Sequence, residues 1–205
     1  MRQRNLRFQC FLKNCIDLVG ATVLVILLFP VFVATGLLVY FGDGAPVIYR
    51  RRVVGVAGEF DAFKFRTMRR DADSILASNP ALQAEYQRNF KLVDDPRITR
   101  LGGFLRKFSL DELPQLFNVL LGQMSLVGPR MITTPELAKY GSHKRVLLSS
   151  KPGLTGYWQV FARQNVSYEE RVSMDLHYLE NWSLGMDLAI LLRTPLRVLK
   201  TEGAF

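Results

Sequence analysis

Residues 18–41 read LVGATVLVILLFPVFVATGLLVYF, an uninterrupted run of 24 residues without a charged side chain. A straight α-helix of this length would reach about 36 Å, enough to cross a hydrocarbon core of about 30 Å. Pro30 lies in the middle of the run. It removes one backbone hydrogen bond and its ring clashes with the carbonyl of Ile26, so the helix is expected to break there. The run therefore indicates a membrane element with a bend at its centre.

Basic residues flank this apolar run on both sides. They are Arg2, Arg4, Arg7 and Lys13 before it, and Arg50, Arg51, Arg52, Lys64, Arg66, Arg69 and Arg70 after it. Because positive flanks stay on the cytoplasmic side, one solution is a re-entrant helix that breaks at Pro30 and leaves on the side where it entered. A kinked transmembrane helix is the alternative, and a secretory signal peptide fits less well because no small-residue cleavage motif follows. Asp17 lies one turn after Lys13, so the two could pair.

The composition leaves room for one further domain. The chain has 205 residues and a net charge of +9, which suits an anionic membrane face, phosphorylated substrates or nucleic acid. We expect no nucleic-acid partner, because no helix-turn-helix, zinc-finger or ribonucleoprotein signature is present. Cys10 and Cys15 are too few for a disulfide scaffold and fit a reducing compartment.

The middle of the chain alternates short elements. Residues 47–52 and 60–65 are predicted to form a β-hairpin, residues 71–77 and 81–89 are predicted to be helical, and residues 94–103 are predicted to be a polar loop. The fold class expected from this pattern is α+β and mainly helical.

The C-terminal part is predicted to hold two helices. Ser167 and Glu170 have the spacing of a capping box, so a helix should start there and run towards Asn181. A second helix is expected over residues 186–200, interrupted at Pro195. Its basic residues share one face and its leucines lie roughly opposite; they are Arg193, Arg197 and Lys200, and Leu188, Leu191, Leu192 and Leu199. This pattern fits a helix lying on a membrane, and packing against the domain core explains the leucines equally well.

The residues best suited to chemistry lie in FSLDELPQLFNVLLGQMSLVGPR, residues 108–130. Ser109 and Glu112 have the spacing of a capping box, and Pro114 favours a helix start nearer Asp111. Either start puts Asp111 and Glu112 in the first turn, where free N–H groups and the helix dipole stabilise anions and should depress the pKa of an aspartate. Ordinary helix capping is the alternative explanation of the two carboxylates.

Arginines surround this carboxylate pair in the sequence. Arg106 and Arg130 flank it and Arg97 precedes it, and guanidinium groups match phosphate oxygens in a bidentate way. A pyrophosphate needs several cations and a carboxylate that holds Mg²⁺, and a carboxylate can also attack phosphorus. Neighbouring helical residues point about 100° apart, so Asp111 and Glu112 can have different roles. The pattern indicates phosphate chemistry at a membrane surface.

Several long blocks, in order, resemble the bacterial sugar transferase family, the monotopic phosphoglycosyl transferases. The resemblance covers nearly the whole chain. The blocks are K-N-x-x-D (13–17), the mid-segment Pro30, FKFRTM (63–68), DPRITRLGGFLRKFSLDELPQLFNVLLGQMSLVGPR (95–130), PGLTGYWQV (152–160) and D-x-x-Y-x-x-N-W-S-x-x-x-D (175–187).

The resemblance implies an enzyme that moves a sugar-1-phosphate from a UDP-sugar to polyprenyl (undecaprenyl) phosphate and releases UMP. It implies that Asp111 is the nucleophile that carries a covalent phospho-sugar, that Glu112 binds Mg²⁺, and that Arg106 and Arg130 contact phosphate. It also implies a monotopic protein on the cytoplasmic face of the bacterial inner membrane, among inner-membrane lipids. Residues 1–42 would form the re-entrant membrane helix, with the break at Pro30, and residues 43–205 the catalytic domain.

The chain departs from the family pattern at a few positions. Phe29 replaces a small polar residue before Pro30, Arg51 stands for glutamine and Val53 for arginine in the hairpin, and Met131 replaces a proline. None of these positions is in the carboxylate pair. Two other interpretations stay open from the residues alone. One is a non-enzymatic membrane adaptor that binds anionic lipid, and the other is a lipid-phosphate hydrolase that uses the same acyl-phosphate chemistry.

Overall fold

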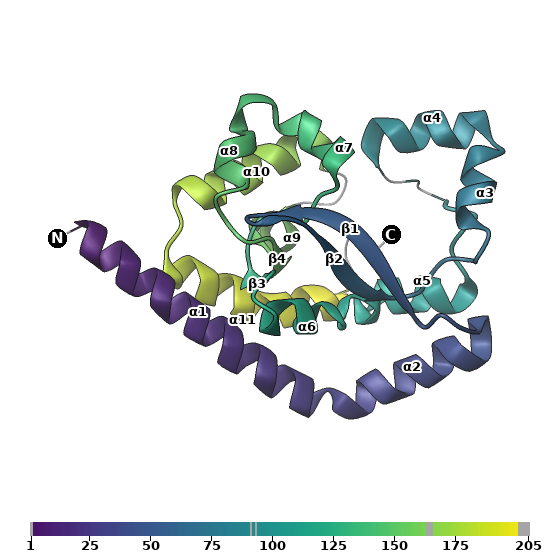
Figure 1. Ribbon diagram of the computed structural model, residues 1–205, viewed down its shortest axis with the longest axis horizontal. Helices are drawn as coiled ribbons and strands as arrows, with labels where there is room; N and C mark the ends of the chain where they lie inside the picture. Colours follow the sequence, from purple (N-terminus) through teal and green to yellow (C-terminus); the bar gives the residue numbers. More distant parts are fainter. Residues whose placement is uncertain (1, 91, 93, 163–165, 201–205) are drawn as a thin grey trace.

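The computed structural model describes residues 2–90, 92, 94–162 and 166–200. Its elements form a mainly helical α+β fold (Figure 1). The helices are α1 (Arg2–Leu27), α2 (Phe29–Asp43), α3 (Ala72–Ala77), α4 (Pro80–Asn89), α5 (Arg100–Lys107), η1 (Leu110–Glu112), α6 (Gln115–Leu120), α7 (Thr134–Leu137), η2 (Ala138–His143), α8 (Lys144–Leu147), α9 (Tyr157–Phe161), α10 (Tyr168–Glu180) and α11 (Leu184–Lys200). The strands are β1 (Ile48–Gly55), β2 (Gly58–Phe65), β3 (Ser125–Val127) and β4 (Gly153–Thr155).

The long apolar run forms two helices that meet in a V. The turn is at Leu28, and Pro30 lies in the first turn of α2, where its missing N–H costs least. The junction of the V points away from the rest of the domain, and both arms return towards it (Figure 1). By length and composition, residues 7–27 of α1 are long and apolar enough to cross a membrane. The predicted break near Pro30 is confirmed.

A largely buried ion pair fastens α1 to α11. The Lys13 Nζ lies 2.7 Å from Oδ2 of Asp187 in α11 and also donates to the carbonyl of Val127 at 2.9 Å. Asp187 accepts two further hydrogen bonds, from the Tyr178 hydroxyl at 2.7 Å and the Trp182 indole at 3.1 Å. The side chains of Lys13 and Asp187 are 16% and 7% exposed, so the pair is shielded from water and fully hydrogen-bonded.

The predicted pairing of Lys13 with Asp17 is wrong. Asp17 is buried, and its Oδ1 accepts the backbone N–H of Leu126 in β3 at 2.9 Å. The two residues lie one turn apart on α1, as the spacing required, but each finds a better partner in the domain against which the helix packs. The second contact therefore ties the same helix to β3, beside the first.

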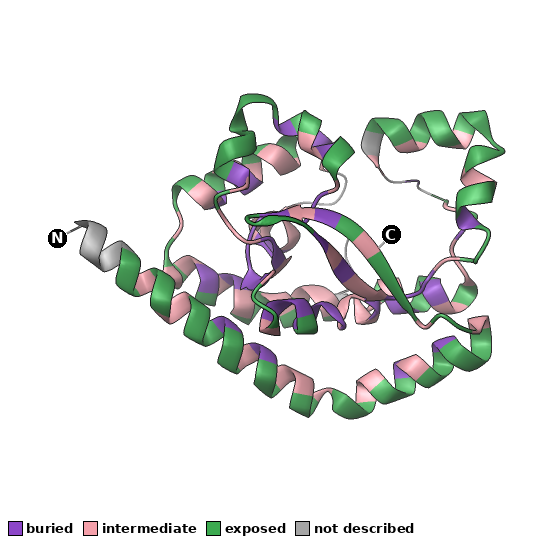
Figure 2. Ribbon diagram, viewed as in Figure 1, coloured by how far each residue is buried: buried purple, intermediate pink, exposed green. Residues whose placement is uncertain are grey.

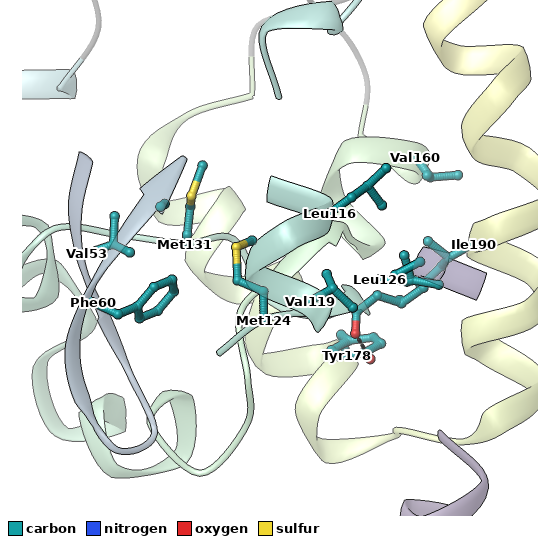
Figure 3. Close-up of a cluster of buried hydrophobic side chains, with 13 residues drawn as sticks. Val53, Phe60, Leu116, Val119, Met124, Leu126, Met131, Val160, Tyr178 and Ile190 are labelled. Atoms are coloured by element: carbon teal, nitrogen blue, oxygen red, sulfur yellow. Dashed lines mark hydrogen bonds between the residues drawn. The ribbon is translucent and has the colours of Figure 1, made fainter. Parts of the chain in front are cut away.

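The predicted hairpin is confirmed and lies over the core. β1 and β2 pair antiparallel from Ile48–Phe65 to Gly55–Gly58, so the strands extend further towards the turn than the sequence indicated. Val53 and Phe60 point into the main cluster of buried apolar side chains, towards Met124 and Met131 (Figure 3). At 1% exposure, Val53 belongs to this core, which explains why a valine suits the position.

A second, parallel two-stranded sheet was not predicted. β3 and β4 pair through Ser125–Gly153 and Val127–Thr155. The strands are three residues long and fully or partly buried, too short for a period-2 pattern to be visible in the sequence. A Cβ at Gly153 would lie 2.1 Å from the backbone N of Gly128, so only glycine allows the two chains to approach this closely.

The C-terminal helices differ in part from expectation. The capping box of Ser167 and Glu170 is present and starts α10, as predicted. α11, however, runs through Pro195 without interruption, so that prediction is wrong. Arg197 donates to the carbonyls of Val160 and Ala162, at 2.7 Å each. The side chain of Lys200, the third basic residue expected on this face, lies outside the described residues.

Most leucines of α11 face outward. Leu188, Leu192, Leu196 and Leu199 are 49–77% exposed, so core packing does not account for them, whereas Leu191 packs against the core. Much of the V is exposed in the same way (Figure 2). Other large apolar side chains that stay exposed include Ile26, Leu27, Phe29, Phe41, Phe104 and Leu121. Apolar exposure on this scale marks an interaction surface and is atypical of a protein surrounded by water.

We predict that Lys13→Met destabilises the protein by about 3 kcal/mol, because it leaves the buried Asp187 carboxylate without its cation. Thermal unfolding of the detergent-purified protein measures the effect. Lys151→Met is the matched control, since Lys151 also reaches α1, through a hydrogen bond to Asn14 at the surface. Equal effects of the two substitutions would contradict a special role for the buried pair.

Candidate functional site

The two predicted carboxylates lie in a tight turn between helices. Asp111 and Glu112 belong to the 3₁₀ helix η1, and α6 begins only at Gln115. The capping box predicted at Ser109 is absent, because Ser109 adopts a left-handed conformation (φ 53°) in which its side chain makes no capping hydrogen bond. The short turn buries Asp111, which is 6% exposed, and leaves Glu112 partly exposed beside it.

Lys64 of β2 reaches both carboxylates. Its Nζ lies 2.6 Å from Oε1 of Glu112 and 3.8 Å from Oδ2 of Asp111. The hairpin thus supplies the cation nearest to the pair, from a position about fifty residues earlier in the sequence. The FKFRTM block had drawn attention to this strand, but nothing in the local pattern distinguished Lys64 from an ordinary outward-facing lysine.

The protein environment separates the pKa values of the two carboxyl groups. Burial raises the pKa of Asp111 above its usual value, although the positive charges of Lys64 and Arg106 oppose the shift. Burial also acts to raise the pKa of Glu112, but the charges of Lys64 and Arg130 outweigh it and leave that pKa below the usual value. The predicted depression of the aspartate pKa is therefore wrong, because burial outweighs the helix end in this turn.

Arg106 belongs to α5, and its charge acts on Asp111 in η1. Its Nε donates to the Thr67 hydroxyl at 3.0 Å, and burial lowers its pKa while the charge of Asp111 opposes that shift. α5 begins at Arg100, within the segment predicted to be a polar loop, and Thr99 caps it. A Cβ at Gly102 would lie 2.0 Å from the carbonyl oxygen of Thr67, so glycine is what lets α5 approach the segment after β2 so closely.

Arg97 is already paired. Its Nε and Nη2 each donate to Asp95 at 2.7 Å in a bidentate pair, and the side chains are 7% and 5% exposed. Its guanidinium carbon also lies 5.1 Å from the centre of the Tyr86 ring. The phosphate-binding role of Arg97 stays a prediction. To bind a substrate phosphate, the guanidinium would have to turn its Nε and Nη2 donors away from the Asp95 carboxylate.

Arg130 lies on the opposite side of the carboxylate pair in the sequence and acts on it electrostatically. Its charge lowers the pKa of Glu112, and its guanidinium carbon lies 5.3 Å from the centre of the Trp158 ring. Its backbone N–H contacts the buried Asp175 at 3.4 Å. The structure therefore brings Arg106, Arg130 and Lys64 to one place around Asp111 and Glu112, and of the three only Lys64 was not predicted.

Asp111 and Glu112 could hold a magnesium ion only together with ligands from outside the protein, such as substrate phosphates and waters. Within the described residues, no three His, Cys, Asp or Glu side chains gather as a metal-ligand set. Mg²⁺ is commonly held by one or two carboxylates together with substrate phosphates and waters, and Asp111 with Glu112 can supply that many. Because Lys64 occupies Oε1 of Glu112, an ion would have to share or replace that contact.

A buried carboxylate with a perturbed pKa, surrounded by cations, is a candidate functional site. The sequence profile described as "Bacterial sugar transferase" matches residues 8–201. The chain belongs to the bacterial sugar transferase family, which confirms the resemblance seen in the sequence.

Individual relatives are similar over nearly the whole chain. A UDP-galactose-lipid carrier transferase of Erwinia amylovora is 46% identical over 199 residues, which is 95% of this chain and 42% of that protein. An undecaprenyl-phosphate galactose phosphotransferase of Salmonella typhimurium is 45% identical, over 99% of this chain and 44% of that protein. The exopolysaccharide production protein ExoY of Sinorhizobium fredii is 44% identical, over 94% of this chain and 88% of that protein. The chain thus spans less than half the length of some relatives and most of another.

We predict that Lys64→Met destabilises the protein at pH 8 by about 2 kcal/mol and much less at pH 5. Without the ammonium group the pKa values of Asp111 and Glu112 both rise. Carboxyl groups whose folded pKa exceeds the unfolded one contribute stability at low pH, which is lost as the pH rises through the folded pKa. Thermal unfolding in detergent at both pH values measures the difference.

The control for this substitution is Lys107→Met, which removes an equal charge from an exposed position near Arg106. It should show a small effect that does not depend on pH. A loss of stability in Lys64→Met that is the same at pH 5 and pH 8 would contradict the electrostatic role of Lys64.

Proposed function

We propose that the protein transfers a sugar-1-phosphate from a UDP-sugar to polyprenyl (undecaprenyl) phosphate and releases UMP, as the first step in making an exopolysaccharide or glycoconjugate. The observation that carries this proposal is Asp111, a buried carboxylate that Lys64 and Arg106 keep in a cationic setting. The names of the relatives, which include lipid carrier and undecaprenyl-phosphate transferases, support both the donor and the acceptor.

The reaction would proceed in two displacements at phosphorus. A carboxylate oxygen of Asp111 attacks the β-phosphorus of the donor, the bond from that phosphorus to the bridging oxygen breaks, and UMP leaves with both electrons of the bond. An oxygen of the lipid phosphate then attacks the same phosphorus and the Asp111 carboxylate departs. A water-soluble donor and a lipid acceptor would thus use the site in turn, without having to fit into it together.

The unequal pKa values fit two separate roles. A carboxylate of raised pKa is the stronger nucleophile once it is ionised, and the charges of Lys64 and Arg106 favour the ionised form of Asp111 against the effect of burial. Glu112, whose pKa is depressed, stays ionised and is the natural ligand for Mg²⁺. Bound there, the ion would supply positive charge against the phosphates. Arg106 and Arg130 would orient the donor's phosphate oxygens.

The exposed apolar surface supports a monotopic location in the membrane. We place α1 and α2 in one leaflet as a re-entrant pair, with the exposed leucines of α11 against the same surface. Basic flanks on both sides of the apolar run favour the cytoplasmic face of the bacterial inner membrane. The site would then open where polyprenyl phosphate presents its head group.

We predict that Asp111→Asn lowers UMP release from UDP-sugars by roughly a thousandfold or more, because an amide cannot act as the nucleophile. It should also abolish the radiolabel that the wild-type protein retains from a donor labelled in its β-phosphate. UMP release by detergent-solubilised protein, with polyprenyl phosphate present, is the measurement.

The same assay separates the other interpretations. Release of UMP from the wild-type protein that depends on polyprenyl phosphate, with a sugar-phosphate lipid as product, supports transfer, whereas free sugar phosphate in its place indicates a hydrolase. Full activity of Asp111→Asn would contradict the covalent step. A membrane adaptor would release no UMP, and its function would survive Glu112→Gln.

We predict that the two ends of the V lie on one side of the membrane. In a Cys15→Ser protein, Cys10 is the single thiol, and it is exposed on α1. A membrane-impermeant maleimide should label it in inverted inner-membrane vesicles and leave it unlabelled in intact cells with permeable outer membranes.

Ser74→Cys in a cysteine-free background marks the catalytic domain and is the matched control. The two thiols should be labelled in the same preparation. Labelling of Cys10 and the residue-74 thiol from opposite sides would show a kinked transmembrane helix and would contradict the re-entrant arrangement.

A further inference from the structure

Two guanidinium groups share the indole ring of Trp158. The guanidinium carbon of Arg171 lies 4.5 Å from the ring centre, and that of Arg130 lies 5.3 Å from it. The three side chains come from separate elements: Trp158 from α9, Arg171 from the first turn of α10, and Arg130 from the segment after β3. Arg171 also lies 5.3 Å from the ring of Tyr168.

No acidic side chain neutralises this pair. Among the described residues, neither Arg130 nor Arg171 has a carboxylate within ion-pair distance. Burial lowers the pKa of Arg171, and the like charge of Arg130 lowers it further. Two cations at one ring repel each other more strongly where water is partly excluded, so the arrangement is costly until an anion joins it.

The acid nearest to the pair compensates only in part. Asp175 is fully buried, accepts the Tyr140 hydroxyl at 2.8 Å and contacts the backbone N–H of Arg130. Burial raises the pKa of Asp175 to about 7. A carboxyl with a raised pKa carries less negative charge at neutral pH than an ordinary aspartate, so Asp175 offsets the two guanidinium charges only in part.

Two hydrogen-bond donors at the same place have no partner among the described residues. They are the Nε of Arg171 and the Nε1 of Trp158, and both atoms are buried. Buried N–H groups are usually paired, so two of them beside two cations indicate an acceptor that binds there, with several oxygens and a negative charge. A phosphate group has both properties, and the planar guanidinium fits it in a bidentate way.

Arg130 connects this cluster to the carboxylate pair. Its charge lowers the pKa of both Glu112 and Arg171, so it lies close enough to act on each. Its guanidinium also shares the Trp158 ring with Arg171, so Arg130 is the cation that a diphosphate with one phosphate at Asp111 would meet with its other phosphate if it reached this cluster. α10 lies on the side of the domain away from the junction of α1 and α2 (Figure 1), which favours a water-soluble ligand over a lipid head group.

We infer that Arg171 and Trp158, together with Arg130, form the subsite for the nucleoside-phosphate half of the donor, the part that leaves as UMP. The inference rests on the proposed function and goes beyond it, because it assigns the leaving group to a place in the fold. Arg171 would hold the phosphate next to the nucleoside, and the indole N–H would donate to the same group.

Equilibrium binding of radiolabelled UMP to the detergent-solubilised full chain tests the subsite. Arg171→Gln should raise the Kd for UMP roughly tenfold or more, since a charge-assisted bidentate contact is lost. The Kd for uridine, which lacks the phosphate, should change less than about twofold, because the lost contact is made to phosphate. Arg171→Lys should bind UMP more weakly than wild type and more tightly than Arg171→Gln, and it gives the test if the glutamine variant does not fold.

Lys139→Gln is the matched control. Lys139 also lies over the Tyr168 ring, at 6.0 Å, but is exposed, so its loss removes the same charge without touching Trp158. It should leave the Kd for UMP within about twofold of wild type, because surface charge alone contributes little.

The failures of the subsite and of the proposed function are distinguishable. If the wild-type protein binds UMP and both Arg171 variants bind UMP as tightly as the wild type does, the subsite is overturned while the proposed function stands. An equal weakening of uridine and UMP binding would also overturn it, since the effect would then be structural. If the wild-type protein binds no uridine nucleotide, the proposed function and the subsite are both overturned.

Discussion

The arrangement of this protein depends on one buried ion pair, Lys13 with Asp187, which joins the N-terminal apolar helix to the C-terminal one. Tyr178 and Trp182 satisfy the remaining acceptor capacity of the aspartate, so a charge that would be costly among apolar side chains is fully hydrogen-bonded. The pair fixes the position of α1 along its axis relative to β3. One turn further on, Asp17 makes a second contact between the same helix and β3, by accepting the backbone N–H of Leu126. The apolar helix α1 and the rest of the fold thereby have a fixed relative orientation.

That orientation matters because the carboxylate pair gains its properties from distant parts of the chain. The hairpin brings Lys64 to Asp111 and Glu112, α5 brings Arg106, and the segment after β3 brings Arg130. The two carboxylates are neighbours in the sequence, yet one has a raised and the other a lowered pKa. The difference arises because Lys64 lies closer to Glu112 than to Asp111 and Arg130 adds to its effect, so positive charge outweighs burial at Glu112 and burial prevails at Asp111.

Local rules predicted well wherever a contact lies within one or two turns of chain. The break near Pro30, the hairpin and the capping box of Ser167 are of this kind, since each follows from backbone chemistry within a few residues. The same rules failed where a tertiary partner outcompeted a local one. Lys13 has Asp17 within reach but pairs with Asp187, and Ser109 adopts a left-handed turn in place of the expected cap.

The sequence by itself determined the long apolar run with its break, the mainly helical class, the family and the carboxylate pair with Arg106 and Arg130, because apolar length, helix-breaking residues and contiguous motifs are properties of adjacent residues. The tertiary structure alone decided that Lys64 contacts the pair, that most leucines of α11 face outward and that Arg171 joins Arg130 at Trp158. These features depend on segments that are many residues apart in the sequence. The burial of a side chain and its distance from other charges, which set the pKa values of the titratable groups, exist only once the chain has folded.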